Sequence, residues 1–365
     1  MSHMKTALAL ARQVLGATSP NPAVGAVVVK DRTEVGHGAT LPPGQSHAEI
    51  GALRQAGAAS QGATLYSTLE PCCIYGRTPP CTRAIIEAGI TQVYVAVIDP
   101  NPRVSGRGCA ELQAAGIEVV VGEEAEYVRE LYEGFAKHVN TGIPFVTAKF
   151  AMSLDGKIAT RTSDSMWITG PESRCRVQQM RRESDAVMVG VNTVLADDPQ
   201  LTARDDVGAP LQRQPLRVIA DSRCRTPPGA RVLQQPGKTL IATCRDAPQE
   251  RVSRLQAAEV EVLQLPPLPS GQVDLEVLLA ELGRRGVVNL LVEGGGTLLG
   301  SLFDLKLVDK VYAFIAPVII GGQRAASPIE GLGAAELAGA WRVARSRMEP
   351  VGSDWLVVGY PAPGD

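Results

Sequence analysis

Aromatic residues are scarce in this chain, at 4% of its 365 residues, which argues against a stacking platform for single-stranded nucleic acid. An excess of one charge is also lacking, because 36 basic and 38 acidic side chains leave a formal net charge of −2. No overall attraction to nucleic acid or to a membrane surface is therefore expected. No apolar run approaches the roughly 20 residues of a membrane span, and residues 5–15 favour an amphipathic helix over a signal peptide. We expect a cytoplasmic protein with no nucleic-acid or membrane partner.

The chain also lacks the cysteine spacing of a disulfide framework. Its seven cysteines are odd in number and scattered, which suits a reducing compartment. Four of them are expected to be ordinary buried or surface thiols: Cys109, Cys175, Cys224 and Cys244. The other three lie between residues 72 and 81.

The most informative pattern combines two of these three thiols with a histidine. His47-Ala48-Glu49 is followed by Pro71-Cys72 and then by Cys81. One imidazole and two thiolates bind Zn²⁺ and leave a fourth position for water, whose pKa then falls toward about 7. A glutamate two residues from the histidine can move protons without binding the metal, as in zinc deaminases. The pattern predicts a zinc site with ligands His47, Cys72 and Cys81 and with Glu49 as proton shuttle.

A purely structural interpretation of these residues is the alternative. His-x-Glu and Pro-Cys pairs occur by chance, and two buried cysteines near a surface histidine would give the same sequence. The flanking patterns oppose it, because His47 opens a helix-like run at 48–55, Cys72 follows a strand-like run at 63–69, and Cys81 precedes a helix-like run at 82–88. Ligands at the starts of two helices that flank a strand are typical of such a site, so we favour the metal.

An insert, Cys73 to Pro80, separates the two ligand cysteines, whereas the shortest version of the motif is Cys-x-x-Cys. Such an insert must pass close to the metal. Arg77 and Thr78 could therefore bind a substrate phosphate through charge-assisted hydrogen bonds, although a solvated loop fits the spacing equally well. Cys73 could in principle replace Cys72 as a ligand, but the Pro-Cys order favours Cys72.

Helices and strands alternate along the whole chain and predict two α/β domains. In the first half, helices are also expected at 5–15, 110–115 and 123–139, and strands at 24–29, 91–98 and 117–121. Thr141-Gly142-Ile143-Pro144 is typical of a linker, which gives domains 1–143 and 144–365. In the second half, helices are expected at 171–182 and 275–282, and strands at 145–150, 186–190, 216–220, 239–243, 260–265, 287–292, 311–320 and 355–358.

A second candidate site is the glycine-rich turn Glu293-Gly294-Gly295-Gly296, which follows an expected strand and precedes a helix-like run. Backbone N–H groups at such a turn can bind a phosphate, although glycine-rich turns often serve only tight packing. Neither the Rossmann pattern nor a P-loop lysine is present. Further candidate positions at strand ends or turns are Lys149, Ser153–Gly156, Ser165–Thr169 and Asp197-Asp198-Pro199.

Taken in order, the most specific stretches are similar to one family. They are Ser19-Pro20-Asn21-Pro22-Ala23-Val24-Gly25-Ala26, His47-Ala48-Glu49, Thr68-Leu69-Glu70-Pro71-Cys72, Pro79-Pro80-Cys81, Asp99-Pro100-Asn101-Pro102, Ser153-Leu154-Asp155-Gly156-Lys157 and Val292-Glu293-Gly294-Gly295. Almost the whole chain resembles the bifunctional riboflavin-biosynthesis deaminase–reductases. The resemblance implies an α/β protein: a cytidine-deaminase-like three-layer domain followed by a dihydrofolate-reductase-like α/β domain.

The resemblance also implies the functional residues. Zinc would be bound by His47, Cys72 and Cys81, with Glu49 as proton shuttle. The deaminase substrate would contact Asn21, Arg77, Asp99 and Asn101. NADPH would be held by Ala151, Trp167, Thr193, Asp197, Ser222, Gly295, Gly296, Thr297, Leu298, Leu299, Gly300 and Ser301. The phosphorylated sugar substrate of the reductase would be held by Lys149, Ser165, Arg181, Leu201, Arg204 and Glu293. We expect Arg181 and Arg204 to clamp the phosphate and Lys149 to polarise the carbon that accepts hydride.

Two positions depart from the family pattern. Many members carry a histidine where this chain has Thr40, and another where it has Ile74. Thr40 could still hydrogen-bond a phosphate or ring group. Ile74 cannot, so it could weaken substrate binding, slow deamination or change the ring preference. The zinc ligands and Glu49 are intact, and we expect deamination to be retained.

Two consecutive reactions on a small phosphoribosyl-pyrimidine follow from the resemblance. The first is hydrolytic deamination of 2,5-diamino-6-(5-phosphoribosylamino)pyrimidin-4-one; the second is reduction by NADPH to 5-amino-6-(5-phosphoribitylamino)uracil. One alternative keeps the reductase, with the deaminase inactive or redirected to a related secondary pyrimidine pathway. A nucleic-acid deaminase is opposed by composition, and a non-enzymatic zinc module by the count of three ligands, since structural zinc sites have four.

The assembly and the choice of dinucleotide are less constrained by the sequence. The amphipathic stretch 123–139 would allow an interface, and we expect a homo-oligomer. The preference for NADPH over NADH rests on the resemblance alone, because no residue is identified that must bind the 2′-phosphate.

Overall fold

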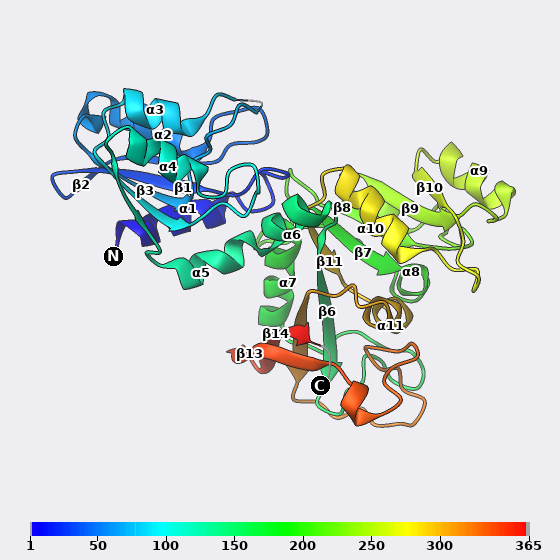
Figure 1. Ribbon diagram of the computed structural model, residues 1–365. Coiled ribbons are helices and arrows are strands. Elements are labelled where there is room, and N and C mark those ends of the chain that lie inside the picture. The colour runs from blue at the N-terminus through cyan, green and yellow to red at the C-terminus, as the bar shows by residue number, and fades with distance from the viewer. Residues whose placement is uncertain (1, 77, 363–365) are drawn as a thin grey trace. The chain divides into compact units, whose positions relative to one another are not determined.

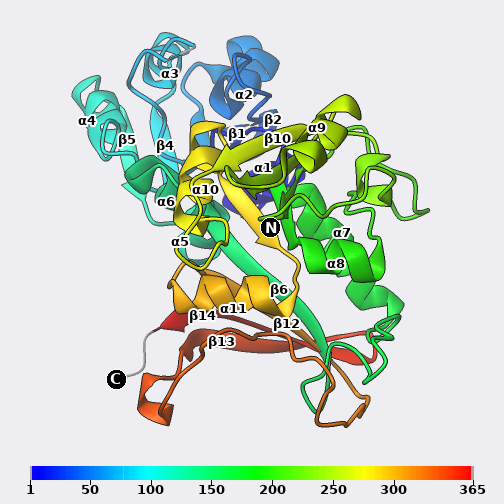
Figure 2. The same cartoon turned by 90° about the vertical axis from the view of Figure 1, so that its right-hand side faces the viewer.

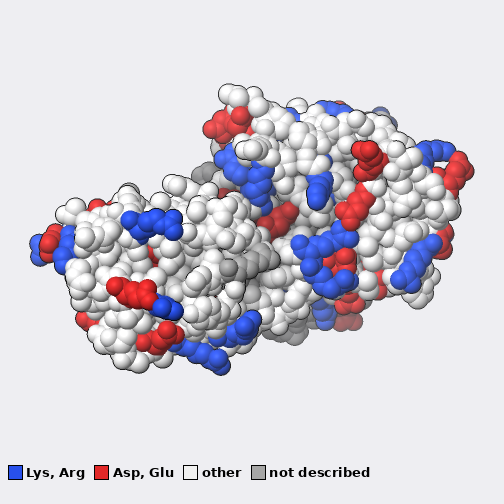
Figure 3. Space-filling model, turned by 90° about the horizontal axis from the view of Figure 1, so that it is seen from above, with Lys and Arg blue, Asp and Glu red and all other residues white. Residues whose placement is uncertain are grey.

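The computed structural model describes residues 2–76 and 78–362, and the chain divides into two compact units (Figure 1). The division falls between Ile143 and Pro144, except that residues 286–288 group with the first unit. Arg77, expected to bind the deaminase substrate, lies outside the described residues. Within the described residues, no helix is long and apolar enough to cross a membrane. Basic and acidic side chains are interspersed on the face seen in Figure 3.

The first unit is built on a five-stranded sheet in the order β2-β1-β3-β4-β5. Strand β1 pairs antiparallel with β2 and β3, whereas β3, β4 and β5 run parallel. The carboxyl ends of the neighbouring strands β3 and β4 therefore lie at the same edge of the sheet, just before Cys72 and Asp99. The strands are β1 Gly25–Lys30, β2 Thr33–Ala39, β3 Thr64–Leu69, β4 Gln92–Val97 and β5 Glu118–Val121.

Helices cover both faces of this sheet, and two glycines allow them to approach closely. A Cβ on Gly25 in β1 would lie 1.9 Å from the Ala7 oxygen of α1 (His3–Gln13), and a Cβ on Gly38 in β2 would lie 2.0 Å from the Ala48 oxygen of α2 (Ala48–Ala56). Gly25 pairs with Ala39, the neighbour of Gly38, so the two glycines face opposite sides. The result is the expected three-layer architecture, completed by α3 (Cys81–Glu87) and α4 (Arg107–Ala114) (Figure 1).

The single helix expected at 123–139 is wrong in detail. The segment forms α5 (Ala125–Arg129), a 3₁₀ turn (Glu130–Tyr132) and α6 (Glu133–Thr141). The turn carries the buried Tyr132, whose hydroxyl lies 2.7 Å from Thr68 Oγ1 and donates to the Ala23 carbonyl at 3.1 Å. This tertiary anchor coincides with the break, which the amphipathic pattern alone does not reveal.

The second unit is built on a nine-stranded sheet in the order β10-β9-β8-β7-β11-β6-β12-β14-β13. Neighbours from β10 to β12 are parallel, and β14 is antiparallel to both β12 and β13. Figure 2 shows this unit from its α9–β10 end to its β13–β14 end. The strands are β6 Phe145–Ser153, β7 Ala186–Gly190, β8 Leu216–Ala220, β9 Thr239–Cys244, β10 Glu261–Leu265, β11 Asn289–Val292, β12 Lys310–Ala316, β13 Arg342–Val351 and β14 Asp354–Ala362.

Four elements were not predicted: β2, β13, α8 and α9. Strand β2 contains two glycines, and β13 is exposed along most of its length, so neither has an alternating apolar pattern. Helix α8 follows β7 directly at Gly190, and α9 buries only two residues. The helices of the second unit are α7 Pro171–Glu183, α8 Val191–Asp197, α9 Gln249–Ala257, α10 Leu275–Arg284 and α11 Gly296–Asp304.

Candidate active sites

The predicted zinc ligands meet at one point of the first unit. His47 is the N-cap of α2, Cys81 is the first residue of α3, and Cys72 follows β3. Their ligand atoms lie within 4.8 Å of one another, and His47 Nδ1 is 3.5 Å from Cys72 Sγ and 3.3 Å from Cys81 Sγ. Tetrahedral Zn²⁺ with bonds of about 2.3 Å to sulfur and about 2.0 Å to nitrogen requires N···S separations of about 3.5 Å. The donor set therefore fits zinc, and among the described residues it includes Cys72 but not Cys73.

The pKa values of the two thiols are shifted in opposite directions. The hydrogen bond with the Cys81 side chain, helped by His47 and by the Cys81 N–H at 3.4 Å, lowers the pKa of Cys72 to about 4. The same interaction with Cys72, together with burial, raises the pKa of Cys81. Thiolates are the form that binds zinc, so metal binding by this pair is coupled to proton release.

Glu49 lies in the first turn of α2, close to the ligands but outside the ligand group. It is 3% exposed, and burial, reinforced by the charge of Cys72, raises its pKa to about 7. A carboxyl group with such a pKa can both accept and release a proton near neutrality. This placement is what a non-ligand proton shuttle requires.

A buried carboxylate missed by the sequence analysis connects the metal edge to the expected substrate loop. Glu70, 2% exposed, accepts hydrogen bonds from the N–H groups of Asp99 (3.0 Å), Gly106 (2.8 Å) and Cys109 (3.1 Å). Asp99 in turn accepts from the Asn101 N–H at 2.8 Å, and burial raises the pKa of Asp99 to about 6. The sequence did offer a signal for Glu70: it is a charged residue at the end of a predicted strand, two positions before Cys72.

Other residues expected near the deaminase substrate are engaged locally. Asn21 lies in the loop before β1, where its carbonyl accepts from Thr18, and the Asn101 side chain accepts from the Arg103 N–H at 3.0 Å. Neither side chain hydrogen-bonds the zinc ligands within the described residues. Thr40 is buried, and its hydroxyl bonds the N–H and carbonyl of Val24 at 3.1 and 3.4 Å. The structure thus corrects the expectation that Thr40 is available to a substrate.

The second unit contains a cavity of about 990 Å³ at the carboxyl ends of its parallel strands. Ligands of open α/β sheets bind at this edge. The Ser165 hydroxyl donates to Asp197 Oδ1 at 2.8 Å, so two expected site residues are joined directly. The expected site residues that line the cavity are Ser165, Thr193, Asp197, Ser222, Gly295, Gly296, Thr297, Leu298 and Ser301.

Four residues expected to hold NADPH are not part of the cavity lining: Ala151, Trp167, Leu299 and Gly300. Trp167 is 71% exposed and lies 4.7 Å from the Arg174 guanidinium. Leu299 is buried, and a Cβ on Gly300 would lie 2.3 Å from the Glu330 backbone. Since successive helical residues point in different directions, only part of the 295–301 turn can face one cavity.

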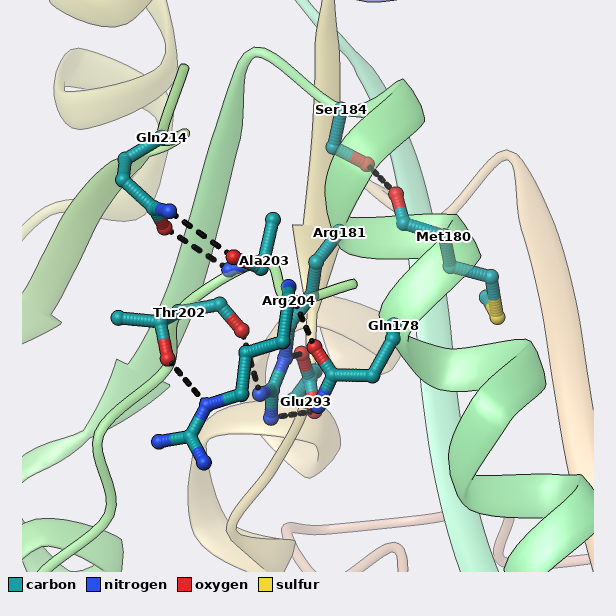
Figure 4. A network of polar contacts seen from close by, with 9 residues as sticks. All are labelled: Gln178, Met180, Arg181, Ser184, Thr202, Ala203, Arg204, Gln214 and Glu293. Atoms are coloured by element: carbon teal, nitrogen blue, oxygen red, sulfur yellow. Dashed lines mark hydrogen bonds and ion pairs between the residues drawn. The ribbon is translucent and has the colours of Figure 1, made fainter. Parts of the chain in front are cut away.

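Lys149, Arg181 and Glu293 form a half-buried charged cluster (Figure 4 shows the last two). Arg181 donates to both carboxylate oxygens of Glu293, at 2.5 and 2.9 Å, and to the Thr202 carbonyl at 3.1 Å. Burial lowers the pKa of Lys149, against the effect of the nearby Glu293 charge. For Glu293, burial acts to raise the pKa, but the Arg181 charge and hydrogen bonds lower it overall. Arg181 is therefore committed to Glu293.

The two arginines of the expected phosphate clamp have different partners. Arg204 uses its Nε to donate to Thr202 Oγ1 at 2.9 Å, and its terminal nitrogens point away from Glu293 (Figure 4). Leu201 is buried beside this loop with a φ of 53°. Arg204 thus hydrogen-bonds the Thr202 hydroxyl, whereas Arg181 is ion-paired with Glu293.

The cavity also contains basic residues that the sequence analysis missed. Arg223 and Arg225 follow β8 directly after Ser222 and line the cavity. Arg225 donates to Asn192 Oδ1 at 2.7 Å, and Arg223 lies 3.2 Å from Asp246 Oδ2. Both arginines lie within five residues of the end of a predicted strand, and this position could have marked them as candidate site residues.

Comparison with known families agrees with both sites. The family model described as "Cytidine and deoxycytidylate deaminase zinc-binding region" matches residues 1–97. The model described as "RibD C-terminal domain" matches residues 144–357, more than half of the chain. The chain belongs to the RibD family. RibD-family membership makes it a bifunctional deaminase and reductase of riboflavin biosynthesis.

Individual RibD proteins resemble the chain over nearly its whole length. The riboflavin biosynthesis protein RibD of Actinobacillus pleuropneumoniae is 42% identical over 98% of this chain and 94% of the relative. That of Aquifex aeolicus (strain VF5) is 43% identical, with 98% and 97% covered. The structure of Acinetobacter baumannii RibD, form 1, is 38% identical with a TM-score of 0.85 and 98% of both chains covered. The structure of a Thermotoga maritima protein, named diaminohydroxyphosphoribosylaminopyrimidine deaminase/5-amino-6-(5-phosphoribosylamino)uracil reductase, is 36% identical with a TM-score of 0.84, covering 98% of this chain and 97% of that one.

Proposed function

We propose that residues 1–143 deaminate 2,5-diamino-6-(5-phosphoribosylamino)pyrimidin-4-one and that residues 144–365 reduce the product with NADPH to 5-amino-6-(5-phosphoribitylamino)uracil. The observation that carries the first step is the convergence of His47, Cys72 and Cys81 beside the buried Glu49. The Thermotoga maritima relative, whose name states both activities, supports this choice of substrate.

In the deamination, Glu49 carries the protons. Bound zinc supplies Lewis acidity at a position open to water. The Glu49 carboxylate would accept one proton from the attacking water and deliver it to the ring nitrogen, and would then carry the second water proton to the departing amine. Water supplies the new carbonyl oxygen, and the exocyclic amine leaves as ammonia.

In the reduction, the cavity holds the dinucleotide and the charged cluster acts on the sugar. NADPH supplies the hydride. The backbone N–H groups at Gly295 and Gly296, where α11 begins, are placed to bind a phosphate of the dinucleotide. Lys149, half-buried and near the charge of Glu293, polarises the carbon of the ring-opened ribosyl group that accepts the hydride. Arg204 binds the sugar phosphate, and Arg181 keeps Glu293 in place.

We further propose that the enzyme is a cytoplasmic homo-oligomer. Seven free cysteines suit a reducing compartment. Strand β13 is an edge of the second sheet, with Val343 and Met348 at 45% and 64% exposure, and exposed apolar side chains on an edge strand can contact another copy. The molar mass in solution, measured by light scattering, tests the assembly: 38.5 kDa would contradict it.

Ammonia release tests the first step. Zinc-loaded protein without NADPH is expected to release ammonia from the diaminopyrimidinone ribotide, and Glu49→Ala is expected to lower the rate by roughly 10²- to 10⁴-fold, the usual contribution of a positioned acid–base group. The variant should keep its zinc and its reductase activity. Absence of ammonia release from folded, zinc-bound parent protein would contradict the deaminase assignment for this substrate. It would leave a reductase with an inactive or redirected first domain.

A further inference from the structure

The two ring nitrogens of His47 face different partners. Nδ1 lies 3.3–3.5 Å from the two cysteine sulfurs, on the side where zinc fits. Nε2 lies 3.3 Å from the hydroxyl oxygen of Thr78. Within residues 2–76 and 78–362, Thr78 is the hydrogen-bond partner of this nitrogen.

A metal-binding histidine must present a lone pair on one nitrogen and carry its proton on the other. If Nδ1 binds the metal, Nε2 is an N–H donor that needs an acceptor. Thr78 Oγ1 is such an acceptor. A partner on the second nitrogen fixes both the tautomer and the ring orientation, and its loss typically costs 10- to 100-fold in metal affinity.

We propose that Thr78 is a positioning residue of the zinc site, whose hydroxyl accepts the Nε2–H of His47 and thereby directs Nδ1 toward Cys72 and Cys81. The inference rests on the proposed zinc-dependent deaminase. It gives the insert between the two cysteines a role at the metal. It also replaces the sequence-based expectation that Thr78 binds a substrate phosphate.

The local backbone supports this role. The Gly76 N–H donates to the Thr78 carbonyl at 3.2 Å, so the Thr78 backbone has a partner on its amino-terminal side. On the other side, Pro79 and Pro80 have restricted φ angles, and Pro80 is the N-cap of α3, whose first residue is the ligand Cys81. The same rigid segment thus carries one ligand and the hydrogen-bond partner of another.

The His47 side chain is available for this partnership because it does not cap its own helix. His47 occupies the N-cap position of α2 but makes no side-chain capping hydrogen bond. Its ring is therefore held by contacts at its two nitrogens. Removing the contact at Nε2 leaves the ring free to rotate away from the thiols, which weakens metal binding without removing a ligand.

A matched pair of variants separates the hydroxyl from the shape of the side chain. Thr78→Val keeps the branched shape and removes the acceptor, whereas Thr78→Ser keeps the acceptor. Zinc affinity is measured on the full-length protein by competition with a chromogenic chelator. We expect Thr78→Val to bind zinc 10- to 100-fold more weakly and Thr78→Ser to stay within a few-fold of the parent, with reductase activity unchanged in both. Equal zinc affinities of the parent and Thr78→Val would overturn the proposal.

The tautomer can be examined in the parent protein, so the test does not depend on a variant that folds. In zinc-loaded, ¹⁵N-histidine-labelled protein, His47 is expected to show a slowly exchanging Nε2–H, assigned among the four histidines by a His47→Gln control. An Nδ1–H on His47 would overturn the proposal while leaving zinc binding intact. Weaker ammonia release by Thr78→Val at unchanged zinc affinity would also overturn it, because Thr78 would then act on the substrate. Failure of the parent to bind zinc would instead remove the proposed function itself.

Discussion

At the level of single residues, burial adjusts the acids and bases of both sites in the direction their chemistry needs. Burial raises the pKa of Glu49 to about 7 and lowers that of Lys149, since a low-dielectric surrounding disfavours either charged form. Shifted ionisable groups gather at functional sites for this reason. Arg181 shows the opposite case: its charge is paired with the Glu293 carboxylate, whose pKa it lowers.

The two arginines after β8 provide a prediction about dinucleotide choice. We expect Arg223 and Arg225 to bind the 2′-phosphate of NADPH, because both line the cavity next to Ser222. Charge-assisted hydrogen bonds of about 1.5–3 kcal/mol correspond to roughly a 10- to 100-fold higher KM for NADPH in the double alanine variant, with little change for NADH. Steady-state reduction with each dinucleotide measures this. Arg254→Ala, exposed on α9, is the control, and an equal loss with both dinucleotides would contradict the assignment.

At the level of elements, both candidate sites form where parallel strands end. In the first unit, the ends of β3 and β4 lead to Cys72 and Asp99; in the second, β7, β8 and β11 lead to the cavity. Adjacent parallel strands end at the same edge of a sheet. The loops and helix N-termini that follow them there are not hydrogen-bonded into the sheet. The arrangement explains why residues far apart in sequence act together at each site.

Glu70 lies directly after β3 and hydrogen-bonds the segment after β4, so its substitution should affect both segments. In Glu70→Gln one acceptor oxygen becomes a donor facing the N–H groups of Asp99, Gly106 and Cys109, so at least one buried N–H loses its partner. We expect the free energy of unfolding of the first unit to fall by about 1–3 kcal/mol and the KM for the deaminase substrate to rise. Denaturant unfolding and kinetics of zinc-loaded protein measure these effects. The exposed Glu87→Gln should be nearly neutral, and the same result for Glu70→Gln would refute the role.

Glu34 links α1 to β2 and makes this contact sensitive to acid. Its carboxylate bonds His3 Nδ1 at 2.8 Å, His37 Nε2 at 2.9 Å and Thr6 Oγ1 at 3.1 Å. The hydrogen bonds from His3 and then His37 lower its pKa from 4.5 to about 2. A lowered pKa stabilises the fold fully above the unfolded value of 4.5, and this stabilisation is lost as the pH falls toward 2.

The corresponding variant tests that pH dependence. Glu34→Gln should be less stable than the parent near neutral pH, and the difference should shrink steadily from about pH 5 to about pH 3. Urea unfolding of both proteins across this range provides the measurement. A stability difference that does not change with pH would show that the carboxylate charge contributes nothing.

At the level of the whole molecule, two units with separate cores carry separate chemistries. The core of the first unit includes Val27, Leu65 and Val93, and that of the second includes Val189, Ile219 and Ile241. The described zinc ligands all belong to the first unit, and the described cavity belongs to the second. Each reaction therefore has its own structural support.

Metal removal should separate the two activities. We expect a strong chelator to abolish ammonia release and to leave the NADPH-dependent reduction of the already deaminated substrate unchanged, because no described reductase residue belongs to the ligand group. Re-addition of Zn²⁺ should restore deamination. Parallel loss of both activities on chelation would contradict the independence of the two sites.

The sequence alone determined the zinc ligands, Glu49, most strands and helices, and the two-part α/β organisation. These features depend on local patterns: donor types at helix starts and strand ends, and hydrophobic periodicity over about ten residues. The resemblance supplied the remaining site residues, of which nine line the cavity of the second unit.

Only the tertiary structure decided the partners of these residues. It engaged Thr40 with Val24, paired Arg181 with Glu293 across 112 positions of sequence, and brought Thr78 to His47. Such contacts depend on how elements distant in sequence pack together. A hydrophobic period of two or 3.6 residues shows which face of an element is buried, but not which distant side chains will be in contact.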